Sequence, residues 1–456
     1  MNATPNTTDS TTDRADEDPA GPSHSHGHSH GHDHGLEGGW QHWARDPVLR
    51  VVLVGVVIAA LATIVGAIAL WPSGDGRRDA IANADATGLV TDRFSATIAD
   101  LTDQQCSYST NDNPQDCRMV ELTVHEGPDA GEVIELPEIN LVFERSVPDF
   151  SVGDKVVVGY EESTDVYFYA DRDRRTSLVV LAGLFAIVVI ALGRLRGLFA
   201  LFAMIATLIV LVAFIAPSAL DGNDPVLVAV VAASAIAFIS LYLTHGFTPT
   251  TTVALAGTLA ALALTLGLTW SFFEIAQFTG LATEEALILP AIAENLDVGA
   301  LLLGGAIIGA LGALDDVTVT QVSTVAEIRR RSPELSTSEL MASGIRVGRD
   351  HIASTVNTLL LAYAGASMPL ILLFAVSDQS LAMVANSEII AVEIGRTLCG
   401  SIGLVAAVPL TTALAAAVLR PTTSEATTVD ASGSKATASE AESVRWEDFG
   451  PTDDTW

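Results

Sequence analysis

The chain has 456 residues, of which 49% are hydrophobic and 17% are charged, and its formal net charge is −31. The charged share is lower than the roughly 25% of soluble domains, and the excess of 54 acidic over 23 basic residues excludes the basic surface that nucleic-acid binding requires. The apolar residues are gathered into blocks long enough to cross a bilayer, which predicts a polytopic α-helical membrane protein.

Two polar segments flank the apolar part of the chain. Residues 1–47 and 421–456 show no apolar periodicity, and we expect disordered tails, the first rich in histidine and the second acidic. The first apolar block, residues 48–70, is long enough to span the membrane and starts too far from Met1 for a cleaved signal peptide. It is therefore predicted to be a transmembrane anchor.

The segment 71–176 is hydrophilic and is followed by further apolar blocks within 177–420, predicted to be a seven-helix bundle. With the anchor they give about eight spans, the later ones lying at 177–193, 197–217, 226–244, 250–270, 299–322, 351–376 and 394–419.

The loop charges predict the orientation of these spans. Arg45 and Arg50 lie just before and at the start of the anchor. Of the predicted inner loops, 194–196 and 323–350 carry arginines and 245–249 carries His245, whereas the loops 218–225, 271–298 and 377–393 carry only acidic charges. By the positive-inside rule both termini are cytoplasmic and residues 71–176 lie outside a bacterial plasma membrane. The exception is an arginine group outside, directly before the second span, comprising Arg172, Arg174 and Arg175.

The outer segment reads as a small β domain of the OB or SH3 barrel type, because short β-branched stretches alternate with turn signals. The predicted strands are Gly88–Thr91, Arg93–Leu101, Met119–Val124, Glu132–Leu136 and Lys155–Tyr160. Cys106 and Cys117 lie in this segment and would form a disulfide on an oxidising side; free thiols are the alternative.

Histidines alternate with small residues near the N-terminus, at His24, His26, His28, His30, His32 and His34. Imidazole is a common ligand of divalent transition metals, so the tract would bind such an ion. Two interpretations stay open: a segment that delivers or buffers metal, and a low-complexity tail without a metal role in the cell.

The sixth apolar block contains the strongest candidate site. Gly305, Gly309 and Gly312 give it a small-residue face suited to close helix packing. An adjacent carboxylate pair, Asp315 and Asp316, follows, and then the polar residues Thr318, Thr320 and Gln321. Carboxylates are costly inside a membrane and usually face a cavity or partner, although a position at the membrane boundary would merely set topology.

Neighbouring residues on a helix point about 100° apart, so the two aspartates cannot line one face of an unbroken helix. Either the helix breaks there, or one aspartate faces a cavity while the other caps or pairs elsewhere. In the last block Glu393 and Arg396 are three residues apart, and they either pair with each other or line an outer vestibule.

The stretch from Gly309 to Gln321, followed by Glu327, resembles the signature of the YibE/F-like family of bacterial multi-pass membrane proteins. The resemblance extends over about residues 48–420 and leaves out both tails. It implies a permease-like membrane protein and names no substrate.

Two functions of different classes follow from these features. The leading hypothesis is a transporter with an ion- or proton-coupled site at Asp315, Asp316, Thr318, Thr320 and Gln321. The alternative is a non-transporting scaffold whose outer β domain binds an envelope partner, and a homo-oligomer fits either hypothesis. An enzyme is not expected, because the sequence has no evident nucleophile–base set and no Walker motif.

Overall fold

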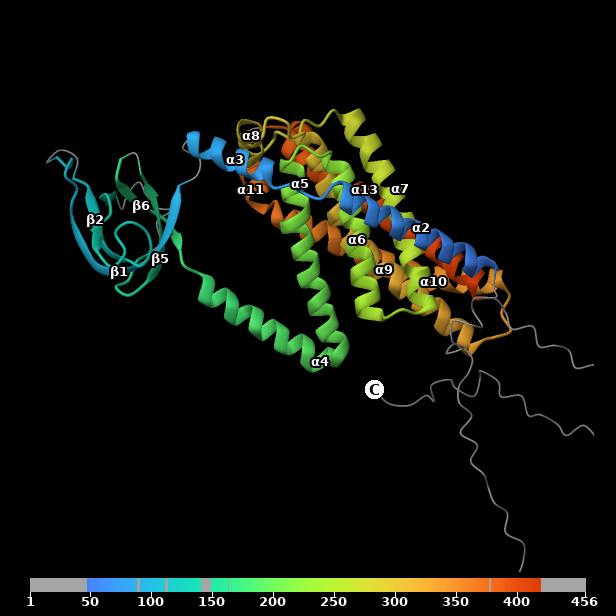
Figure 1. Cartoon of the computed structure of the whole chain (residues 1–456). Coiled ribbons are helices and arrows are strands. Elements are labelled where there is room, and N and C mark those ends of the chain that lie inside the picture. The colour runs from blue at the N-terminus through green and yellow to red at the C-terminus, as the bar shows by residue number, and fades with distance from the viewer. Residues whose placement is uncertain are drawn as a thin grey trace, which may run out of the picture.

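The computed structural model describes residues 47–87, 91–110, 114–140, 149–162, 164–376 and 379–419. The tails and the histidine tract predicted within them lie outside these ranges, apart from Pro47. The described chain forms a helical bundle and a separate antiparallel sheet, which is attached to the bundle through α3 and α4 (Figure 1).

Most of the long helices match the predicted apolar blocks. Within the described ranges six helices are long and apolar enough to cross a membrane, and α10 with α11, bent by 63°, forms a seventh candidate if the pair is one span. The helices are α2 (Pro47–Ala69), α3 (Asp75–Ala86), α4 (Arg175–Val210), the π-helical turn η1 (Leu211–Ile215), α5 (Ala216–Leu220), α6 (Pro225–His245), α7 (Pro249–Ala276), α8 (Glu284–Ile292), α9 (Val298–Arg331), α10 (Thr337–Ala366), α11 (Met368–Val376), α12 (Leu381–Asn386) and α13 (Glu388–Val418).

The segment Arg175–Leu220 is continuous as one candidate span but is interrupted at Arg194, which has φ 53° and ψ −131°. Its two halves meet at a sharp turn (Figure 1). Gly197 permits this turn, because a Cβ there would lie 2.2 Å from the Val189 carbonyl oxygen. The halves correspond to the predicted spans 177–193 and 197–217.

The helices continue past the apolar blocks, so the predicted loop 323–350 is mostly helical. α9 runs on to Arg331, and α10 begins after a capping box in which Ser336 and Glu339 bond each other's backbone N–H groups. The hydrophobic pattern marks the buried length of a helix and does not show where its backbone hydrogen bonds end.

α7, α9 and α13 form the centre of the bundle. α7 and α13 approach closely at two points, where a glycine of one helix packs against a threonine of the other. A Cβ at Gly257 would lie 2.7 Å from Thr411 Oγ1, and one at Gly403 would lie 1.9 Å from Thr265 Oγ1. Small residues at helix contacts are typical of membrane bundles, where close approach replaces the hydrophobic effect.

The sheet has the strand order β3-β2-β1-β5-β6, with β4 paired to β2, and all its pairings are antiparallel. Its strands are β1 (Asp92–Gln105), β2 (Asp116–Val124), β3 (Val133–Glu135), β4 (Ile139–Asn140), β5 (Lys155–Glu161) and β6 (Val166–Arg172). β4 and β6 were not predicted, and residues 88–90 of the first predicted strand lie outside the described residues. Barrel closure stays a prediction, because β3 and β6 end the described path.

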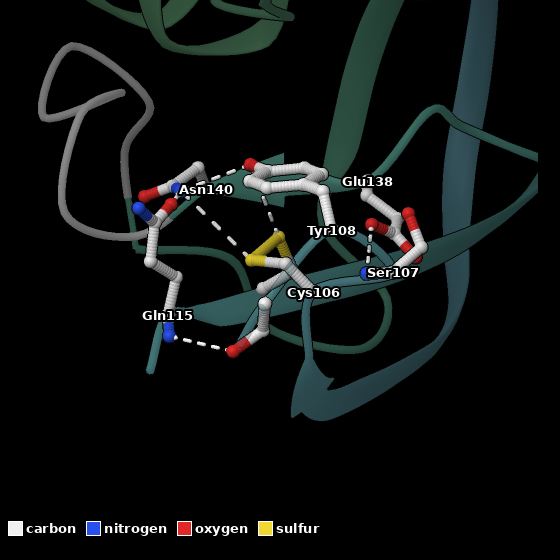
Figure 2. Close-up of a disulfide and its surroundings, with 8 residues drawn as sticks. Cys106, Ser107, Tyr108, Gln115, Glu138 and Asn140 are labelled. Carbon is white, nitrogen blue, oxygen red and sulfur yellow. Dashed lines mark hydrogen bonds between the residues drawn. A yellow bond between two sulfur atoms is a disulfide. The ribbon is translucent and has the colours of Figure 1, made fainter. Parts of the chain in front are cut away.

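The sheet domain is cross-linked by a disulfide between Cys106 and Cys117, which confirms the predicted pair. Figure 2 shows the polar side chains around it. Asn140 donates from Nδ2 to Tyr108 Oη at 2.9 Å and to Gln115 Oε1 at 2.7 Å, and Ser107 N–H donates to Glu138 at 2.9 Å. The bond and its neighbours therefore tie β4 to the loop between β1 and β2.

Replacing both bonded cysteines by serine is expected to destabilise the sheet domain by about 3 kcal/mol, because the bond closes a loop with a sequence separation of 11. Hydrogen exchange of the β1 and β2 amides in the full chain measures the loss. Cys399→Ser is the control, since Cys399 is a free cysteine in α13. Unchanged exchange in the double variant would show that the bond does not stabilise these strands.

Asp221, which follows α5, holds the start of α3 against the bundle. Its carboxylate accepts hydrogen bonds from Ser73 and from the backbone N–H groups of Gly74 and Gly76, the last at 2.9 Å. The Gly76 backbone lies against Leu220, because a Cβ there would be 2.1 Å from the Leu220 carbonyl oxygen. Asn83 at the other end of α3 donates to Ile292 O at 3.1 Å, which adds α8 to this layer.

This contact should be pH-dependent. Burial raises the pKa of Asp221, but the donors on Ser73, Gly76 and Gly74 lower it more, so the pKa lies below its ordinary value. A depressed folded pKa stabilises the docked state above the unfolded pKa of about 3.9, and this stabilisation is lost as the pH falls through the folded value. We expect full protection of the α3 amides from neutral pH to about pH 5 and loss below pH 4.

The matching variant is Asp221→Ala, for which hydrogen exchange in α3 should speed up about tenfold or more, since it removes hydrogen bonds to a charged group. Asp75→Asn is the control, because the exposed Asp75 carboxylate pairs with Arg78 of its own helix. Equal exchange in both variants would contradict a docking role for Asp221.

Candidate functional site

The predicted carboxylate pair lies on one unbroken helix, α9. Of the two arrangements left open by the sequence, the helical break is therefore wrong. Asp315 is half-buried and turned toward α6, whereas Asp316 is exposed. The two side chains diverge as helical geometry requires, and they do not form a single two-carboxylate site.

Asp315 is the most confined acidic group of the strip. Ser240 of α6 donates to its Oδ2 at 3.0 Å, and its Oδ1 is buried without a hydrogen-bond partner in the described part of the chain. Ser240 precedes the end of α6 by five residues, about 7.5 Å at 1.5 Å per residue. Asp315 thus lies in the bundle close to the end that carries the α6–α7 loop.

Thr318 and Gln321 face the bundle core. The Thr318 hydroxyl lies 2.6 Å from that of Thr258 on α7 and also donates to the Asp315 carbonyl oxygen at 3.1 Å. Gln321 donates from Nε2 to Gly344 O of α10 at 2.8 Å and to Thr412 Oγ1 of α13 at 2.7 Å. These two residues hold α7, α10 and α13 around α9, which is a packing role.

The contact around Gln321 depends on Gly344 and Gly348 of α10. A Cβ at Gly348 would lie 2.5 Å from Val408 Cγ1 and 2.8 Å from Gln321 Oε1, and one at Gly344 would lie 2.9 Å from Thr412 Cγ2. Sequence reasoning missed this pair, although its spacing is the small-xxx-small signal. Ser240, the partner of Asp315, carried no such signal, because a lone serine in an apolar helix usually bonds its own backbone.

The glycine face predicted for close packing is open in the structure. Apart from the adjoining backbone of α9, no atom of the described residues lies within 4 Å of a Cβ built on Gly305 or Gly312, and one built on Gly309 meets the Tyr363 hydroxyl at 3.0 Å. The glycine that packs is Gly304, against Ala229 and the Pro225 carbonyl. Within the described chain this close contact lies one position before Gly305, because composition cannot tell which side of a helix meets a neighbour, and close packing on the predicted face stays a prediction.

Near the opposite end of the bundle, Arg396 Nη1 binds Glu393 Oε1 at 3.0 Å, so these residues of α13 pair with each other. They also line a cavity between α9, α13 and the α7–α9 connection. The predicted pairing is confirmed, and the position of this cavity on the outer side of the membrane stays a prediction. Glu388, which begins α13, accepts from the backbone N–H groups of Thr279 and Gly280, each at 2.8 Å, and ties that connection to α13.

Within the described ranges no group of three or more His, Cys, Asp or Glu residues is arranged to hold a metal ion. The histidine tract lies outside those ranges, so its metal binding stays a prediction.

The comparisons with known proteins give one match. A family model described as YibE/F-like protein matches residues 181–421. No curated protein and no solved structure shows significant similarity to the chain. The match covers the helices from α4 to α13, whereas α2 and the sheet domain, which the sequence resemblance was expected to include, lie before it.

Proposed function

The chain belongs to the YibE/F-like family, and from this membership and the geometry of α9 we propose that it is an ion- or proton-coupled membrane transporter with Asp315 at its coupling site. The observation that carries the proposal is the Asp315 carboxylate, held by Ser240 with one buried oxygen free of partners in the described chain. A carboxylate inside an apolar bundle is costly and is characteristic of ion and proton pathways. Asp316 and Thr320 extend the proposed site on the exposed side of the helix, and Thr318 and Gln321 support it by packing α9 against α7, α10 and α13.

The proposal places eight spans in a bacterial plasma membrane. The count takes the two halves of Arg175–Leu220 as separate spans and the bent pair α10–α11 as one. Two features support cytoplasmic termini and an outer position for residues 71–176. The disulfide is typical of an oxidising compartment, and Asp221 and Asn83 join predicted outer segments at one end of the bundle.

The direct test is flux in proteoliposomes that contain the purified full chain. Protons, alkali cations and divalent metal cations are each given a gradient, and internal ion or pH indicators record the uptake. We expect flux of at least one of them above that of protein-free vesicles. If none of these ions is transported by protein shown to be folded and oriented, the scaffold hypothesis is left. Under that hypothesis deletion of residues 85–170 destroys function, and the aspartates tolerate replacement.

We assign the chain no enzymatic step. Any energy for movement would come from a gradient coupled at Asp315, since the sequence carries no Walker motif for nucleotide hydrolysis.

A further inference from the structure

One face of α9 is uncovered along much of its length. The exposed residues follow each other at helical spacing, and all are small or polar: Gly305, Gly309, Gly312, Asp316, Thr320 and Ser323. By contrast, the exposed residues of α2 and α4 are mostly large and apolar, as lipid contact requires. A face of this composition fits water or protein better than lipid.

The face opens into a cavity of about 410 Å³ at the end of the bundle where α13 begins. Gly305 forms part of its wall, and the charged residues around it are Glu285, Glu388, Glu393 and Arg396. Since Arg396 is already paired with Glu393, the remaining charge of this cavity is negative.

At the other end the face reaches a second cavity, of about 260 Å³, where α4, α6, α7 and α9 meet. Ser323 lies in its wall with Arg196, His245 and the hydroxyl-bearing Thr248, Thr250 and Thr251. Asp316 is one helical turn from Val319, another wall residue, and lies within electrostatic range of His245. The two ends of the same helical face therefore each form part of the wall of one cavity.

Between the cavities the face is kept open by glycine. Among the described residues, no other element comes within 4 Å of the Cβ position of Gly312, whereas the Tyr363 hydroxyl of α10 lies 3.0 Å from that of Gly309. Asp316 follows Gly312 by one turn. A charged group thus lies where a permeating ion would leave the glycine-lined part.

We propose that the α9 face from Gly305 to Ser323 is the wall of an aqueous path for cations, joining the two cavities and passing Tyr363 at its constriction. This inference rests on the proposed transport function and names its substrate class. The selectivity follows from net charge: Glu393 and Arg396 cancel each other, and Glu285, Glu388 and Asp316 outweigh Arg196 of the second cavity. A lining of net negative charge concentrates cations.

A second copy of the chain covering the face is the competing occupant. A twofold contact centred on the glycines would bring Asp316 close to its own copy, and two like charges in a dry contact are unfavourable. The two cavities at the ends of the face, each with charged residues in its wall, would also remain unexplained. Charge and cavities together favour water.

Single cysteines in a Cys399→Ser background test the path, because the remaining native cysteines are bonded to each other. Gly305→Cys, Gly312→Cys, Thr320→Cys and Ser323→Cys are exposed to membrane-impermeant methanethiosulfonates from either side of sealed vesicles. Ala310→Cys, on the buried side of α9, and Ile209→Cys, on the apolar exposed side of α4, are the controls. We expect modification at all four face positions and none at the controls.

The charge of the reagent tests the substrate class. At Thr320→Cys a trimethylammonium reagent should react about tenfold or more faster than a sulfonate reagent, after division by each reagent's rate with a free thiol in solution. Adding Asp316→Asn should lower this ratio. A ratio at or below one would overturn the cation assignment.

Absence of modification at the face positions would overturn the path, and so would intermolecular disulfides formed through Gly312→Cys. These readouts need water and not transport, so their failure is separate from failure of the coupling site. If face positions are modified while Asp315 variants transport normally, the path stands and the proposed coupling role falls.

Discussion

Asp315→Asn is expected to abolish the activity of the chain, lowering its rate about a hundredfold or more, the range lost when a group that takes up and releases protons is removed. Asparagine has nearly the same shape as aspartate, and its carbonyl oxygen can still accept the hydrogen bond from Ser240, which is 3.0 Å long in the wild type. The fold should therefore survive, while the group can no longer change charge.

Complementation of a deletion strain measures the activity, and immunoblotting of the membrane fraction measures abundance. Asp350→Asn is the matched control, because it removes the same charge from an exposed position on α10. Ser240→Ala separates positioning from chemistry: it keeps the carboxylate and removes its donor, so we expect partial activity. Wild-type growth with both Asp315→Asn and Asp316→Asn would refute the coupling site.

Arg329→Ala is expected to give the largest loss of stability, about 3 kcal/mol or more, because it removes hydrogen bonds from a buried charged donor to three backbone carbonyls. The Arg329 side chain is 5% exposed. It donates to Leu419 O at 2.8 Å, Pro333 O at 3.1 Å and Leu335 O at 2.6 Å. It thereby holds the end of α13 and the α9–α10 turn to α9.

Arg330→Ala, at the neighbouring residue, is the control. Arg330 is half exposed and pairs with Glu327, and such surface pairs contribute at most about 1 kcal/mol. Arg329→Lys should remain unstable, since one ammonium cannot replace a planar guanidinium that reaches three carbonyls. The melting temperatures of the purified Arg329→Ala, Arg329→Lys and Arg330→Ala variants in detergent measure these differences. Equal melting temperatures for Arg329→Ala and Arg330→Ala would contradict the anchoring role.

Much of the bundle could be predicted because the hydrocarbon of a membrane imposes two simple constraints on the sequence of a helix that crosses it. Any helix in hydrocarbon must bond its own backbone and face lipid with apolar side chains, so blocks such as 226–244 and 250–270 locate α6 and α7 closely. The sheet domain was predicted less completely. β6 was missed because its residues Val166–Arg172 mix aromatic and charged side chains, and its partner β5 decides their pairing.

The sequence does not show which of the three consecutive arginines at the end of α9 is buried. In sequence Arg329, Arg330 and Arg331 contribute equally to the cytoplasmic charge. In the structure the first is buried on backbone carbonyls, and the other two pair with Glu327. The orientation of α9 about its own axis decides which arginine takes which role, and the local sequence does not specify this orientation.

The sequence by itself indicated a multi-pass membrane protein of the YibE/F-like type and marked the polar strip of α9 as its unusual feature, and it left Cys106 and Cys117 either bonded or free. Hydrophobicity, charge and spacing carry that information along the chain. Only the tertiary structure decided that Asp315 meets Ser240 while Asp316 is exposed, and that Gly304 packs while Gly305 and Gly312 stay open. Those outcomes depend on which neighbour each helical face meets, and helices far apart in sequence set that neighbour.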